Sequence, residues 1–347
     1  MKINNTRIYK KKRFWAGLLL AQLVLFFILS KIDFAVCFFS ELFEWKKNFH
    51  NSLFSKIPFS VGDLFYTFLS VWIFYLLINI RKPKKETLKK LLLTINILCF
   101  IYQFFWGMLY FQPPMIEKLP QKEITENDLK IFARKYLELC KQSRKKVSEN
   151  ESGVFVIKNL PRLEREILLL QNQIDPKINR KKAVKILCMK PSLYNHFMNF
   201  TGILGYYNPF TSEAQFNPNL PATQIPFTLA HEMSHQMGYA REQEASFAAY
   251  LIAKKSQNPD LVYSMQLYVL KSLLRNLSDE RFVEKILDGF SAKMKKDREF
   301  EIEFFRRNDN ILTDVFGVTN DLFLKSNQQD GGITYNYFVN LVVLYES

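Results

Sequence analysis

Two histidines and a glutamate within residues 228–246 have the types and spacing of a catalytic metal site. His231 and His235 are four residues apart, so on a helix both imidazoles project from one face and can reach a single ion. Glu232 follows His231 directly and lies at the flank of the same face, where it can accept a proton from a metal-bound water. This order, H-E-x-x-H, is the pattern of zinc peptidases.

The chemistry that this pattern predicts is peptide hydrolysis. Zinc lowers the pKa of its bound water toward about 7 and stabilises the oxyanion, while Glu232 accepts the proton as the water attacks a carbonyl group. The residues around the motif are uncharged and none of them is proline, so the helix can be buried. Two buried histidines and a buried glutamate each need a compensating partner. We therefore expect a zinc site, and the alternative is a chance pattern on a structural helix.

A catalytic zinc site needs a third protein ligand and one open position. Arg241 stands where the H-E-x-x-H-x-x-G-x-x-H class has its third histidine, and a guanidinium does not coordinate, so that class is excluded. After the turn expected at Gly238, Glu242 and Glu244 both come within reach, but residues two apart point about 200° from one another on a helix. Ser246 shares the face of Glu242. We favour Glu242 as the ligand, with Glu244 as the alternative. Either acid can also be a solvated residue at a helix N-terminus.

Two further features ahead of and behind this stretch bear on substrate binding. Residues 205–217 are rich in Gly, Tyr, Phe and Pro, which is typical of a strand and loop. They are either the edge strand that binds an extended substrate or an ordinary packed loop.

An oxyanion is often stabilised by a Tyr or His as well as by the metal. The candidates are Tyr206, Tyr207, Tyr335 and, more weakly, His196.

Three apolar stretches predict transmembrane helices at about residues 14–30, 64–80 and 91–111. A membrane span needs about 20 apolar residues. A soluble helix of this length normally shows a charged stripe, and none of the three does. Their strongly polar members include Gln22, Asn96 and Gln103.

The charge distribution predicts the orientation and excludes nucleic acid as a partner. The net charge is +15, with 48 basic and 33 acidic residues, and residues 1–90 alone hold 16 basic and 5 acidic residues. This excess lies in two short runs beside apolar stretches, at residues 2–13 and 81–90, rather than over one face of a domain. Such runs stay in the cytoplasm. We therefore expect residues 1–111 to form a membrane anchor and residues 112–347 to lie outside the cytoplasm.

The sequence leaves one structural alternative open in the membrane anchor and one in the outer part. Residues 34–54 alternate aromatic and charged side chains, so they form either an amphipathic helix on the membrane surface or a packed loop. Cys140 and Cys188 are in a part where a disulfide is chemically allowed, but two free buried thiols are an equal alternative.

The outer 236 residues are enough for one domain. Helical patterns cover about residues 125–146, 162–173, 227–237, 242–255, 260–277, 279–308 and 334–345, and residues 183–189 resemble a short strand. The expected fold class is mainly α: three N-terminal transmembrane helices, then a mostly helical, zincin-like metallopeptidase domain with a small β-sheet.

The three spans, the stretch GYYNPFTSEAQFN and the stretch PFTLAHEMSHQMGYAREQEASF together resemble the DUF3810 family of bacterial membrane proteins, over essentially the whole chain. The resemblance implies a multi-pass protein of the bacterial inner membrane and a gluzincin-like peptidase acting on a peptide or protein. It implies His231, His235 and Glu242 or Glu244 as zinc ligands and Glu232 as the base. Family members tend to have Asn at the position of Ser246, and Ser can also accept a hydrogen bond from an imidazole.

A second class of function uses the same residues without catalysis. In it, zinc stabilises a membrane receptor or assembly module. Structural zinc sites are normally closed by four protein ligands and rarely retain a base, so three ligands beside Glu232 favour the enzyme. The sequence leaves the oligomeric state open.

The orientation gives a first testable prediction. A protease added to intact spheroplasts or protoplasts is expected to cleave the chain after Phe111. The two basic runs stay in the cytoplasm, so the residues after Phe111 lie on the opposite side of the membrane. Immunoblotting with an antibody against the C-terminus measures the loss of the full-length chain. Protection of residues 112–347 until the membrane is broken would reverse the topology.

Overall fold

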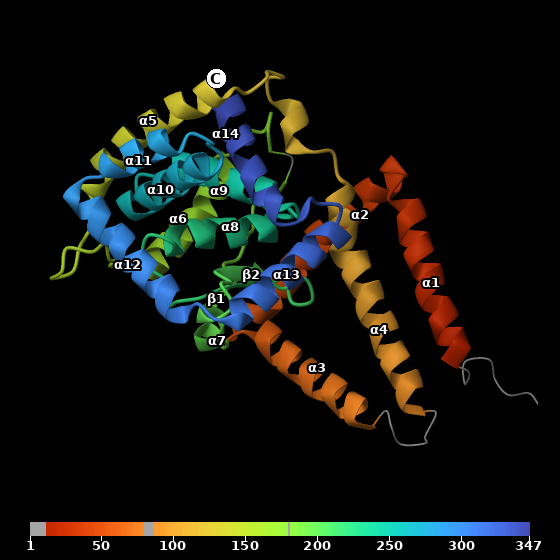
Figure 1. Ribbon diagram of the computed structural model, residues 1–347. Coiled ribbons are helices and arrows are strands. Elements are labelled where there is room, and N and C mark those ends of the chain that lie inside the picture. The colour runs from red at the N-terminus through yellow and green to blue at the C-terminus, as the bar shows by residue number, and fades with distance from the viewer. Residues whose placement is uncertain (1–11, 80–85, 180) are drawn as a thin grey trace, which may run out of the picture.

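Three long helices near the N-terminus project from a helical body in the computed structural model, which describes residues 12–79, 86–179 and 181–347 (Figure 1). They are α1 (Lys12–Leu29), α3 (Val61–Ile78) and α4 (Glu86–Phe105). Each is long and apolar enough to cross a membrane. Most residues of the basic runs at 2–13 and 81–90 lie outside the described residues.

Helices α1 and α4 pack against each other through two of the polar residues noted above. The Gln22 side chain donates to the Asn96 side chain over 3.3 Å, and Asn96 donates to the Trp15 carbonyl over 3.0 Å. Amide side chains that satisfy each other between apolar helices are typical of membrane proteins. At most 17% of the residues in each apolar window are buried within the chain. The remaining surface of these helices therefore suits lipid.

Residues 33–54 form a helix, α2 (Asp33–Phe54), that joins the spans to the body. Its inner face is buried: Lys47 donates to the Met237 carbonyl over 3.2 Å, and Lys46 donates to the Pro209 carbonyl. Its outer face is apolar and exposed. The exposed side chains are Phe34, Phe38, Trp45, Phe49 and Leu53. The buried face also carries apolar side chains such as Phe39 and Phe43, so α2 is a helix packed on the body through a mixed face, with an aromatic face left exposed.

The three strands form one small sheet beside α8 (Ile225–Met237). The order is β1 (Met189–Pro191), β3 (Ala214–Phe216), β2 (Gly205–Tyr207), with β1 parallel and β2 antiparallel to β3. The sequence placed a strand at 183–189, but β1 begins only at its last residue. The single stretch 205–217 is two strands, because Asn208 accepts from the backbone of Phe210 and closes a tight turn.

The rest of the body is mostly helical, as the sequence predicts, although the helices at residues 195–199 and 311–326 were not among those predicted. The other elements are η3 (Gly107–Phe111), η4 (Met115–Lys118), α5 (Glu126–Arg144), α6 (Leu160–Leu170), η5 (Gln171–Gln173), α7 (Asn195–Asn199), α9 (Glu242–Lys254), α10 (Pro259–Arg275), α11 (Glu280–Asp288), α12 (Ala292–Asn308), α13 (Ile311–Ser326), η6 (Gly331–Asn336) and α14 (Tyr337–Glu346). The helix predicted over 279–308 is broken between α11 and α12, because Ser291 caps a new helix by accepting from the Met294 backbone. The mainly α fold class is confirmed.

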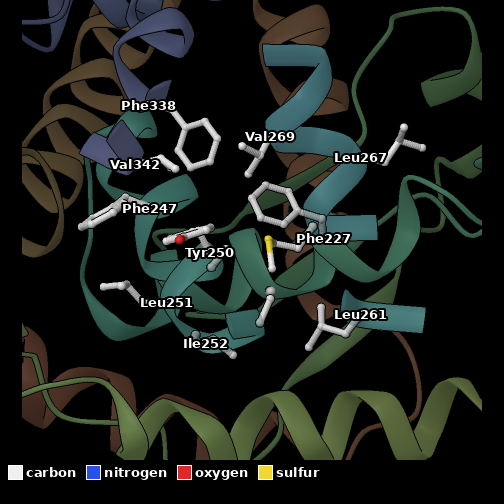
Figure 2. Close-up of a cluster of buried hydrophobic side chains, with 14 of the residues drawn as sticks. Phe227, Phe247, Tyr250, Leu251, Ile252, Leu261, Leu267, Val269, Phe338 and Val342 are labelled. Atoms are coloured by element: carbon white, nitrogen blue, oxygen red, sulfur yellow. The ribbon is translucent and has the colours of Figure 1, made fainter. Parts of the chain in front are cut away.

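The main core lies between α8, α9, α10 and α14 (Figure 2). Large side chains such as Phe227, Phe247 and Phe338 fill it, and all three are buried. Helix α9 turns small residues toward α8, which lets the two helices approach closely; Ala245 and Ala249 are fully buried. Cys140 and Cys188 are free thiols inside the body.

A buried carboxylate ties the sheet to the start of span α3. Glu213 accepts from the backbone N–H groups of Val61 and Gly62, over 3.1 and 2.5 Å, and pairs with Lys190 over 2.6 Å. An acid at a helix N-terminus satisfies donors that the helix itself cannot pair. Lys190 also donates to the Phe59 carbonyl. The sheet and the membrane helices therefore share one polar core.

This pair gives a stability prediction. Replacing Glu213 by Ala leaves Lys190 buried and unpaired, which costs about 3–5 kcal/mol and lowers the melting temperature by about 10 °C. Differential scanning fluorimetry of the full chain in detergent measures it. Glu303→Ala is the control, because Glu303 pairs with exposed arginines. Its replacement is expected to cost under about 1 kcal/mol. Equal shifts for the two variants would contradict the structural role of Glu213.

Candidate metal centre

Helix α8 and the turn after it are shaped by two residues. Pro226 occupies the first turn, where its missing N–H costs nothing. Gly238 ends the helix with a φ of +107°, in the left-handed region that side chains other than glycine rarely adopt. A Cβ at Gly238 would also stand 3.0 Å from the Phe43 ring of α2. The chain then reverses and enters α9 alongside α8.

This reversal brings three ligand-type atoms together. The Nε2 atoms of His231 and His235 are 3.1 Å apart. An Oε2 atom of Glu242 lies 3.1 Å from the first and 3.6 Å from the second. Three of the residues singled out in the sequence thus form one cluster that could hold a metal ion.

The other nitrogen of each imidazole has a partner of its own. Nδ1 of His235 donates to the Tyr239 carbonyl over 2.6 Å, because a carbonyl can only accept. Nδ1 of His231 lies 3.0 Å from the Ser246 hydroxyl. Such partners fix the ring orientation and direct Nε2 to a metal. Ser246 therefore holds His231, as its spacing from Glu242 suggested.

The charges of the cluster are strongly coupled. Burial lowers the pKa of His231. Burial alone would also lower the pKa of His235, but the Glu242 carboxylate outweighs it and raises that pKa to about 9. Burial acts to raise the pKa of Glu242, and the neighbouring histidines hold it well below its usual range. The site therefore favours a positive charge among these three atoms.

The donor set and its spacing fit zinc. Zinc takes His nitrogen and carboxylate oxygen at about 2.0–2.2 Å in a tetrahedral arrangement, which places ligand atoms about 3.3–3.5 Å apart. The three observed separations bracket this value. His231 and Glu242 each keep about 15% of their side-chain surface exposed, so a small molecule can approach.

Glu232 lies beside this cluster, close enough to His235 and Glu242 for both charges to act on it. Its side chain is buried, and its Oε2 atom has no hydrogen-bond partner among the described residues. Burial raises the pKa of Glu232 to about 8. A Cβ on Gly205 would meet the Glu232 carboxyl oxygen at 2.8 Å, so β2 runs directly past it. A buried carboxylate kept unpaired is a signature of a functional group.

Glu244, the alternative ligand, has other partners. It accepts from the Met115 backbone over 2.8 Å and pairs with Arg241 over 3.0 Å. Arg241 in turn donates to the carbonyls of Tyr110 and Gln112, over 2.8 Å each. This group fastens the start of α9 to the segment that leaves span α4.

The residues that were candidates for stabilising the oxyanion lie in different places. Tyr206 donates to Asp63 of α3, and the Tyr207 ring packs 4.5 Å from Trp106. His196 is exposed on α7. Tyr335 is the candidate near the cluster: burial and the negative charges of Glu242 and Glu232 raise its pKa far above the usual value, so its phenol stays protonated.

Three other residues around the cluster were not predicted from the sequence. The Trp106 ring, one residue beyond α4, lies 6.0 Å from the His235 ring. Gln329 accepts from the Glu242 backbone N–H over 3.1 Å. Tyr268 stacks on Phe227 at 4.1 Å. All three come from distant parts of the chain, and no local pattern marks them.

Comparison with known protein families shows to which family the chain belongs. A family model described as a protein of unknown function, DUF3810, matches residues 38–343. The chain belongs to this family. The matched range of this DUF3810 chain begins in α2 and includes α8, α9 and every residue of the cluster. No curated protein and no solved structure matches.

The cluster predicts which glutamate binds metal. Glu242→Gln is expected to weaken zinc binding by at least about 100-fold, since even residues behind the ligands contribute 10- to 100-fold. Isothermal titration of the purified full chain with zinc measures it. Glu244→Gln is the matched control and is expected to keep its zinc affinity while lowering the melting temperature. Loss of zinc by Glu244→Gln with full binding by Glu242→Gln would reverse the assignment.

Proposed function

We propose that this DUF3810 protein is a membrane-anchored zinc metallopeptidase. His231, His235 and Glu242 hold the metal, and Glu232 is the general base. The observation that carries the proposal is the buried Glu232 carboxylate, left without a partner beside three converging ligand atoms. A purely structural zinc site has no use for such a group.

The residues divide the work as follows. When bound, zinc supplies an activated water and a positive charge for the developing oxyanion. Glu232, with its pKa raised to about 8 by burial, takes the proton of the attacking water and later delivers it to the leaving amine. Ser246 and the Tyr239 carbonyl keep the two imidazoles oriented. Tyr335, held protonated, is the side chain available to donate to the oxyanion.

The sheet offers a place for the substrate backbone. Strand β2 lies at the edge of the sheet, and Tyr206 pairs with Gln215 of β3. In this register the backbone groups of Gly205 and Tyr207 point away from β3. A peptide that pairs with them extends the sheet. Since Gly205 touches Glu232, the peptide passes the base. An unfolded segment of a protein or peptide is therefore the proposed substrate class.

The arrangement of the spans supports an extracytoplasmic site. The end of α1, the start of α3 and the end of α4 all adjoin the body (Figure 1). The opposite ends adjoin the basic stretches 2–13 and 81–90. Basic stretches stay in the cytoplasm, so the body and its cluster belong on the other side of the membrane.

The activity is tested with the full chain in detergent or liposomes, loaded with zinc and given a peptide library. Glu232→Gln is expected to lower kcat by about 10²–10⁴-fold, the usual contribution of a general base, and to retain zinc. Glu280→Gln, at the exposed N-terminus of α11, is the matched acid control and is expected to remain fully active. Mass spectrometry identifies the cleaved bonds.

The same experiment distinguishes the peptidase from the non-catalytic alternative. Zinc bound by both proteins, with no peptide bond cleaved by either, would contradict the peptidase and support a zinc-stabilised receptor or assembly module. Cleavage that is equal for Glu232→Gln and the parent chain would remove Glu232 from the mechanism.

A further inference from the structure

Helix α13 presents an apolar stripe that no part of the described chain covers. Ile311, Val315, Val318 and Leu322 have exposed fractions between 51% and 76%. At 100° per residue these four positions lie within about 60° of one another on the helix. A continuous exposed stripe of this size marks a contact surface.

The other face of α13 is fixed to the body. The Phe316 ring contacts the Phe197 ring of α7 at 5.6 Å. The Thr313 hydroxyl donates to the Phe200 carbonyl over 3.0 Å. Leu324 is fully buried. The exposed stripe is therefore held in one direction and is not the outer side of a loosely attached segment.

Both ends of α13 lie at the level where the spans meet the body. Near its C-terminus, the Phe323 ring lies 6.2 Å from the Tyr102 ring, and Tyr102 donates to Asn327 over 2.7 Å. Tyr102 belongs to the last turn of α4. Near its N-terminus, α13 contacts α7, and Tyr194 just before α7 lies 2.6 Å from the Thr67 hydroxyl.

Thr67 is in the second turn of α3, about 9 Å along that helix from its first residue. Helix α13 thus adjoins the last turn of α4 directly and the second turn of α3 through Tyr194 and α7. Figure 1 shows α13 between α7 and the upper end of α4.

We propose that α13 lies in the interfacial layer of the lipid bilayer, with Ile311, Val315, Val318 and Leu322 among the acyl chains. The stripe adds to the exposed apolar surface that α3 and α4 already carry, with side chains such as Phe68 and Phe100. Asp314, Asp321 and Lys325 flank it, as the polar border of an interfacial helix requires. The aromatic outer face of α2 provides a second contact of the same kind.

This placement brings the candidate metal centre to the membrane surface. Gln329, three residues beyond α13, accepts from the Glu242 backbone, and Tyr335 follows in η6. Trp106, just beyond α4, touches His235 on the other side. The inference about α13 does not depend on metal or activity, because it rests on the exposed face and its position.

The test is lipid quenching of a fluorophore on α13. Val318→Cys and, separately, Leu322→Cys are labelled with bimane in the full chain, with Cys37 and Cys99 replaced by Ser, and reconstituted in phosphatidylcholine vesicles. Lipids spin-labelled near the headgroup are expected to quench both sites at least 2-fold more than lipids labelled deep in the acyl chain. Ile131→Cys, equally exposed on α5, is the control and is expected to remain unquenched.

The other outcomes contradict the proposal. Quenching of Val318 and Leu322 by aqueous iodide alone, at the level of Ile131, would place α13 in water. Protection from both iodide and lipid quenchers, with cross-linking between Val318→Cys chains, would assign the stripe to a second copy of the protein.

Discussion

Three electron-rich atoms, one nitrogen from each of His231 and His235 and one oxygen from Glu242, are held 3.1–3.6 Å apart in a largely buried place. Their lone pairs repel unless a positive charge lies among them. Without metal, that charge is a proton on His235, whose pKa the Glu242 carboxylate raises to about 9. We propose that zinc replaces it. The close packing of α8 on α9 and the left-handed turn at Gly238 serve this constraint.

The membrane helices belong to the same framework as the cluster. Lys47 of α2 donates to the last carbonyl of α8, where a cation is favoured by the helix dipole. Arg241 and Glu244 bind the segment that leaves α4, and Glu213 caps the first turn of α3. The ends of the spans therefore determine where the α8–α9 pair and the sheet stand. A soluble fragment that lacks α2 and Trp106 loses contacts to the cluster itself, so experiments need the full chain.

Local pattern was sufficient for the spans, for α8 and α9, and for the spacing of His231 and His235, because helix periodicity fixes which side chains share a face. It favoured Glu242 over Glu244 only weakly, because Met115, which donates to Glu244, is far away in sequence. Helix α13 and the neighbours Trp106 and Gln329 were missed for the same reason: their places depend on tertiary contacts. The strands are only three residues long, too short for a period-2 signal: β1 was misplaced, and the stretch 205–217, predicted as one strand with a loop, contains both β2 and β3.

X-ray absorption at the zinc edge, on the full chain loaded with one equivalent of zinc, tests directly whether His231, His235 and Glu242 bind the metal. We expect a four-coordinate ion with only nitrogen and oxygen neighbours at about 2.0–2.1 Å. We also expect outer-shell scattering from two imidazoles, which falls to one imidazole in His235→Ala. A six-coordinate shell of oxygens without imidazole scattering, or sulfur at about 2.3 Å, would contradict this ligand assignment.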